Sequence, residues 1–267
     1  MRGILGNENF ITSNSCRAGI LPALGQPRRL SYIIEFPFLG ISTVSEMPSK
    51  IEPFLWVKSM SVAITEAITT LAEAEERFHL TRTEDAAFFS EWWADLPQLS
   101  VAEQAGLAEM RRRYLYQRSQ NHLLESTVML LFASPLLTLA GFYDPPFQVK
   151  AEESIQLNLE DSEESLQGRL DVLVLQEQFW VVVLESKKTA LSVWAALPQT
   201  LAYLMANPHP DRPSFALMTN GDDSVFVKLT QSNERLYNFS RVFAALTSTQ
   251  ELQQVLQVLK RMGQMVV

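Results

Sequence analysis

Apolar positions recur three or four residues apart directly after Met60, which is the spacing of one buried helix face. These positions are Ala63, Ile64, Ile68, Leu71 and Ala72. A second short helix is expected over residues 88–93, and its Phe and Trp side chains are typical of core packing. A longer helix is predicted to open at Ser100, because Glu103 stands at the capping-box position.

The run from Ser126 to Phe142 is uncharged and strongly apolar. It is slightly short for a membrane span, and a proline interrupts it. Ser134 is a natural N-cap and Pro135 a natural first helical residue. The pattern therefore favours two buried core helices over a membrane segment.

Beyond Asp144-Pro145-Pro146 the chain changes to short runs rich in β-branched and aromatic residues, which indicate strands. Asn220-Gly221 is a strong hairpin-turn signal between the last two runs. The order of elements predicts an α/β fold with a mixed central sheet covered by helices on both faces. The predicted strands are Phe147–Leu159, Gly168–Leu175, Phe179–Glu185, Ser214–Thr219 and Ser224–Leu229, and the predicted helices are Val193–Ala206 and Ser240–Met262.

Residues 1–46 differ from the rest, since they hold five of the ten glycines and show no sustained helix or strand period. We expect this stretch to be disordered or to be a non-native leader, with Met47 or Met60 as the real start. Residues 47–120 are expected to form a helical N-terminal segment. Residues 121–267 are expected to form the core, including the C-terminal helix.

Composition limits the chemistry that the chain can perform. One cysteine, Cys16, and three histidines are too few for a typical zinc site, so any metal would be a hard cation held mostly by carboxylates. The single cysteine also fits a reducing, cytoplasmic setting. The net charge of −8 has the wrong sign for binding nucleic acid through phosphates alone, although a local basic groove remains compatible with it. Arg111-Arg112-Arg113 is the best basic patch, either as a solvated face or as a phosphate clamp.

The sharpest chemical signal is GRLDVLVLQEQFWVVVLESKK, residues 168–188. A hairpin turn near Gln176 to Gln178 is expected to place Asp171 opposite residues 183–185, beside Glu185. Glu185 and Lys187 are two apart and share a strand face. Two carboxylates can hold Mg²⁺ and a lysine can orient a water, which is what phosphodiester hydrolysis requires. A structural ion-pair network is the alternative.

Gln199 and Tyr203 are four residues apart, so they lie on one face of the predicted Val193–Ala206 helix. Asp171, Glu185-x-Lys187 and Gln199-x-x-x-Tyr203 together resemble the signature of the PD-(D/E)xK nuclease superfamily. The Gln-x-x-x-Tyr element resembles the nuclease domain of type I restriction enzyme R subunits. The surrounding sequence is also similar to that of stand-alone cyanobacterial restriction-endonuclease-like proteins.

The resemblance implies a restriction-endonuclease-like core and assigns roles by position. Asp171 and Glu185 would be ligands of Mg²⁺ (or Mn²⁺), and Lys187 would orient the attacking water. Gln199 and Tyr203 would contact the nucleic-acid backbone. A further metal ligand would come from the preceding helix, where Glu125 matches best. Alternatively, Glu125 is an exposed residue near the helix N-terminus that the helix dipole stabilises. Glu153 is a weaker candidate.

The expected function is therefore a metal-dependent endonuclease acting on DNA. A catalytically silent module that binds nucleic acid or a protein partner on the same fold is the alternative. The chain has no Walker A sequence, so any motor must be a separate partner. A homodimer and a separate specificity partner stay open.

Overall fold

The computed structural model describes residues 61–120, 123–158, 165–175, 179–183 and 192–265. The chain divides into two units, residues 1–55 and 56–267, and every described residue belongs to the second unit. The expectations for residues 1–46, and for Met47 or Met60 as the start, lie outside the described residues.

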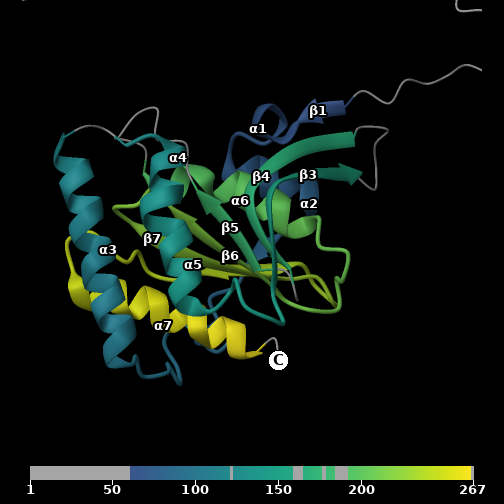
Figure 1. Cartoon of the computed structure of the whole chain (residues 1–267). Coiled ribbons are helices and arrows are strands. Elements are labelled where there is room, and N and C mark those ends of the chain that lie inside the picture. Colours follow the sequence, from purple (N-terminus) through teal and green to yellow (C-terminus); the bar gives the residue numbers. More distant parts are fainter. Residues whose placement is uncertain (1–60, 121–122, 159–164, 176–178, 184–191, 266–267) are drawn as a thin grey trace, which may run out of the picture. The chain divides into compact units, whose positions relative to one another are not determined.

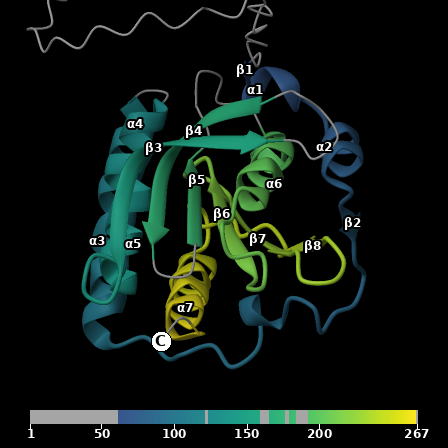
Figure 2. The same ribbon diagram turned by 90° about the vertical axis from the view of Figure 1, so that its right-hand side faces the viewer.

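The described strands form one mixed sheet in the order β1-β4-β5-β6-β7-β8-β2, with β3 paired to the outer side of β4 (Figures 1 and 2). Three pairs are parallel, namely β1 with β4, β5 with β6 and β2 with β8, and the others are antiparallel. The strands are β1 (Ser61–Ala63), β2 (Thr81–Arg82), β3 (Gln148–Asn158), β4 (Ser165–Leu175), β5 (Phe179–Val183), β6 (Ser214–Thr219), β7 (Ser224–Thr230) and β8 (Leu236–Phe239).

Helices cover both faces of this sheet because alternate residues of its central strands are apolar on each side. On β6, Phe215 and Leu217 belong to one apolar cluster, whereas Ala216 and Met218 belong to the other. The first cluster packs under α3 (Val101–Gln120), α4 (Glu125–Val128), α5 (Ser134–Ala140) and α7 (Thr249–Met265). The second packs under α1 (Ile64–Ala67), α2 (Leu71–Phe78), the 3-10 turn Val193–Ala196 and α6 (Leu197–Met205).

This architecture confirms the predicted α/β class with a mixed sheet flanked by helices. It also confirms the longer helix from Ser100, whose Oγ accepts from the Glu103 backbone N–H at 3.2 Å. The three strands from residue 147 to 183, the helix that follows them and the hairpin around Asn220-Gly221 all lie where they were predicted.

The single helix predicted after Met60 is wrong, because the chain there forms β1, α1 and α2 in succession. Thr70 interrupts the helical backbone because it is the N-cap of α2. Its hydroxyl accepts from Glu73 N–H, and the Glu73 carboxylate accepts from Thr70 N–H at 3.0 Å. A Thr in this role has extended backbone, so it separates two helices that share one apolar pattern.

The apolar run 126–142 is one continuous helical stretch and not two helices. Ser134 has helical φ and ψ of −62° and −44°, so it is not an N-cap. A π turn over Met129–Ala133 joins α4 to α5, and Ser134 N–H donates to Met129 C=O. Such a turn is wider than an α-helical one, and we attribute it to Pro135, whose ring clashes with the carbonyl four residues earlier in a regular helix. None of the helices in the described ranges has the length and apolarity that crossing a bilayer requires.

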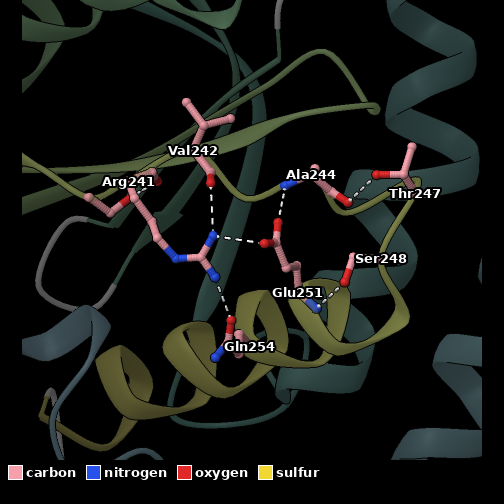
Figure 3. A network of polar contacts seen from close by, with 8 residues as sticks. Arg241, Val242, Ala244, Thr247, Ser248, Glu251 and Gln254 are labelled. Carbon is pink, nitrogen blue, oxygen red and sulfur yellow. Dashed lines mark hydrogen bonds and ion pairs between the residues drawn. The ribbon is translucent and has the colours of Figure 1, made fainter.

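Two further predictions were wrong in detail. Residues 88–93 form only a 3-10 turn, Ser90–Trp92, with Phe89 buried in the core and Trp93 53% exposed. The last helix begins at Thr249, not Ser240, because Phe243 forms a β-bridge with Ser224 and a turn over residues 245–247 follows it. In Figure 3 the Glu251 carboxylate accepts from Ala244 N–H and from Arg241, and Ser248 Oγ accepts from Glu251 N–H. These contacts fix the helix start.

The hairpin turn at Asn220-Gly221 strongly favours glycine at position 221. Gly221 has φ of +86°, and an added Cβ would lie 2.0 Å from Tyr114 Oη. Gly141 has a similar φ of +85° but open space around it. Comparing Gly141 with Gly221 therefore separates the energetic cost of left-handed backbone, which both share, from the cost of steric overlap, which only Gly221 has.

We expect Gly141→Ala to lower the free energy of unfolding by about 1–2 kcal/mol, which is the cost of left-handed backbone for an L residue. Gly221→Ala should cost about 1–3 kcal/mol more, because the methyl group overlaps Tyr114. Urea unfolding measures both. Tyr114→Phe in the Gly221→Ala background should recover part of the loss; no recovery would contradict the packing argument.

Candidate functional site

One of the predicted carboxylates lies on a described strand. Asp171 is in β4, and the structure describes its backbone. Glu185 and Lys187 follow β5 in the sequence but lie outside the described residues, which resume at Ser192. The site is therefore built from the strand positions that lead into it and from the neighbouring elements.

The register of the hairpin differs from the expected one by at least one residue. Val174 pairs with Phe179, Leu173 with Trp180 and Val172 with Val181. Continued by one step, this register puts Asp171 opposite Val182 and not opposite residues 183–185. The difference arises because the first pair is formed by Val174 and not by Leu175.

Strand β4 has two halves with different neighbours on one of its edges. Residues 165–167 pair with β1, and residues 172–174 pair with β5. Residues 168–171 therefore have no described strand partner on that edge. Figure 2 shows that the β3–β4 hairpin is bent, so that one part of it passes over α6. Asp171 lies in this interruption, where β4 still pairs with β3 on one edge but has no described strand partner on the other.

Tyr203 and Gln199 stand on α6, which packs under the bend. Tyr203 is only 4% exposed and Gln199 is partly buried. A Cβ added to Gly168 would lie 2.7 Å from Tyr203 Cε1 and 3.2 Å from its hydroxyl, so glycine allows β4 to approach the ring closely. Tyr203 thus contacts β4 at Gly168, and Asp171 follows Gly168 by three residues on the same strand.

A cavity of about 580 Å³ opens at this place. Its described lining comes from β1, α1, the β3–β4 hairpin and α6, and the lining residues are Ala63, Thr65, Ser154, Ile155, Gln156, Gln167, Gly168 and Tyr203. Ser154, Gln156 and Gln167 are exposed, so their polar groups are accessible from solvent. Sequence reasoning missed this cavity, because β1 reaches it from a distant part of the chain.

The two remaining metal candidates are less informative. Glu125 is the first residue of α4 and is partly buried, a position where a helix dipole favours a carboxylate. Glu153 pairs with Leu170 across the β3–β4 ladder. In the described part of the chain, no three His, Cys, Asp or Glu side chains converge as a metal site; Glu185 and the Asp171 side chain are outside that set.

The basic patch at Arg111-Arg112-Arg113 is largely occupied by internal contacts. Arg111 donates to the carbonyls of Leu246 and Thr247. Arg112 and Arg113 donate to Glu109, and the Arg112 hydrogen bond lowers the pKa of that carboxyl to about 2. These contacts argue against the phosphate-clamp interpretation of the three arginines.

Another charged group lies where β6 ends, beside the end of the parallel strand β5. Arg118 on α3 contacts both carboxylate oxygens of Asp222, at 3.4 and 3.1 Å. Tyr114 donates to the same carboxylate, and burial followed by the Asp222 charge raises the pKa of its phenol. This group ties α3 to the 220–223 turn, and no sequence motif marks it.

No model of a known protein family matches the chain, and no curated protein matches it.

Asp223 in the same turn provides a test of the electrostatics at this edge of the sheet. Burial first, then the charges of Asp222 and Glu251, raises the pKa of its carboxyl. A raised folded-state pKa means that ionisation of Asp223 destabilises the fold as pH rises past its ordinary value of 3.8.

We therefore expect Asp223→Asn to raise the unfolding midpoint at pH 7, because the amide removes the buried charge. The gain should shrink as pH falls and disappear below 3.8, where the wild-type carboxyl becomes protonated in both the folded and the unfolded state. Urea unfolding across this pH range measures it. The exposed Asp211→Asn is the matched control, and an equal, pH-independent gain in both variants would refute the argument.

Proposed function

We propose that the protein is a metal-dependent nuclease that hydrolyses DNA phosphodiester bonds, with Asp171, Glu185 and Lys187 as its catalytic set. The observation that carries the proposal is the position of Asp171. It lies in the interruption of the β4 edge, next to the strand that runs into Glu185 and Lys187. A carboxylate at an interrupted strand edge is held by the strand backbone while that edge stays open to a ligand.

The residue types of this set fit a hard divalent cation. Two carboxylates offer oxygen ligands of the kind that Mg²⁺ and Mn²⁺ prefer, and the chain has too few Cys and His for a typical zinc site. Asp171 and Glu185 would hold the ion, with Glu125 as the weaker third candidate. When bound, the ion would neutralise phosphate charge and acidify a water.

The other residues act on the substrate and the water. Lys187 would orient the attacking water and balance the charge that develops on the phosphate. Tyr203 and Gln199 would hold the nucleic-acid backbone by hydrogen bonds from α6. The burial of Tyr203 against Gly168 supports this role, because a packed ring positions its hydroxyl with little rotational freedom.

A restriction-endonuclease-like core is part of this proposal. Its support is the order of elements, in which α4–α5 precede the antiparallel meander β3-β4-β5, and α6 leads into β6 parallel to β5. The register adds one requirement. Strict alternation after Val183 would put Glu185 on the opposite face from the partner of Asp171. The bend of β4, or a one-residue bulge after Val183, must bring the two carboxylates together.

The test is cleavage of supercoiled plasmid by the full chain with Mg²⁺ or Mn²⁺. We expect nicking that EDTA abolishes and that Lys187→Ala, Asp171→Asn and Glu185→Gln each lower at least about a hundredfold, as loss of a general acid–base group does. Lys188→Ala removes the same charge one residue away, so it is the matched control and should retain activity.

Retained metal-dependent nicking in Lys187→Ala would refute the assigned mechanism. DNA binding without cleavage, unchanged in Asp171→Asn, would instead identify a catalytically silent binding module. Circular dichroism melting of each variant separates loss of chemistry from loss of fold.

A further inference from the structure

We propose that the cavity beside Tyr203 receives one unpaired nucleobase of the substrate strand, contacted by Gln156 and Gln167. This inference rests on the proposed nuclease function and deepens it, because it assigns the substrate class as nucleic acid with an unpaired base next to the cut. The volume of about 580 Å³ lies within the usual range for small-ligand pockets, roughly 300–1,000 Å³.

The described lining of the cavity is uncharged and mixes apolar residues with five polar side chains. It offers two amides, the hydroxyls of Thr65 and Ser154 and the phenol of Tyr203. Uncharged donors and acceptors match the edge of a base better than a phosphate, which attracts Lys and Arg. A protein of net charge −8 also obtains little binding affinity from contacts with phosphates. Contacts with a base would therefore supply part of its affinity for nucleic acid.

The two glutamines are placed to act together. Gln156 and Gln167 are direct partners in the β3–β4 ladder, so their side chains leave the same face as nearest neighbours. Gln156 Nε2 donates to Ser165 Oγ at 2.8 Å, and this hydrogen bond holds the amide in place. A glutamine amide presents a donor and an acceptor side by side, the pattern that pairs with adenine.

The location ties the cavity to the proposed chemistry. Gly168 lines the cavity and precedes Asp171 by three residues, a span of about 10 Å at 3.3 Å per residue. Bases in a stacked strand are about 3.4 Å apart, so a base in the cavity would lie within roughly three steps of the catalytic set.

The concave shape favours an unpaired base over a duplex. A duplex is read by an element that protrudes into a groove, whereas an enclosed base must first leave the stack. A single strand does not have to break base pairs to do so. The rival arrangement, in which the β3–β4 hairpin enters a duplex groove as a ribbon, uses the same glutamines and predicts the opposite substrate preference.

The experiment measures binding by the full chain in EDTA, so that no cleavage occurs. The probes are a single-stranded adenine-containing oligonucleotide, an abasic strand with the same number of phosphates, and the corresponding duplex. We expect wild type to prefer the base-bearing strand to both others. Gln156→Ala/Gln167→Ala should lose about tenfold of that preference, as removal of a base contact does.

Gln117→Ala/Gln250→Ala is the matched control, because it removes two exposed glutamines from α3 and α7. Gln167→Glu keeps the side-chain shape and removes the donor, so its preference should also fall. Equal binding of base-bearing and abasic strands by wild type would overturn the inference, as would an unchanged preference in the double variant. A glutamine-dependent preference for duplex would also overturn it, in favour of the ribbon.

Plasmid nicking on the same preparations separates the two proposals. Nicking without a base preference would refute the base site alone. A base preference without nicking would refute the nuclease and leave the cavity as a base-binding site.

Discussion

The central sheet is apolar on both faces, and this constraint decides where charge can lie. Every residue of β6 is buried, and the first four residues of β7 are buried with it. The one lysine in this region, Lys228, contacts Glu91 at 2.5 Å and the Phe88 carbonyl at 2.7 Å, since an unpaired buried charge is costly. Other charged groups lie at the margins of this buried region: Asp222 is in the turn after β6, where Arg118 of α3 contacts it, and Asp171 is in the part of β4 that has no described partner on one edge.

The interior of the fold could be predicted because it depends on local periodicity. The β3-β4-β5 meander, α6 and the Asn220-Gly221 hairpin each carry their own apolar pattern or turn residue. The missed elements β1 and β2 have three and two residues, too few to show a period. They exist only because β4 and β8 offer edges to pair with. Likewise Thr70 and Pro135 each change a helix boundary through one side chain, and the apolar periodicity of a whole segment does not show such an effect.

The site divides in the same way. The strand that carries Asp171 and the helix that carries Gln199 and Tyr203 could be predicted from their own sequence patterns, whereas the register of the β4–β5 hairpin could not. The cavity could not, because Ala63 and Thr65 reach it through a parallel pairing with residues more than half of the described chain away. The role of Arg111 was equally hidden, since its acceptors are carbonyls near residue 246, contributed by the turn before α7.

The parallel pairing of β1 with β4 also implies an order of assembly. Ser61 meets Ser165, and Thr81 meets Leu236, through two of the shortest strands in the sheet. Closing so long a loop costs chain entropy, and few hydrogen bonds repay it. These strands can dock only after β4 and β8 are in place. The wall of the cavity that β1 contributes is therefore completed late in folding, and only three pairs of strand residues attach it to β4.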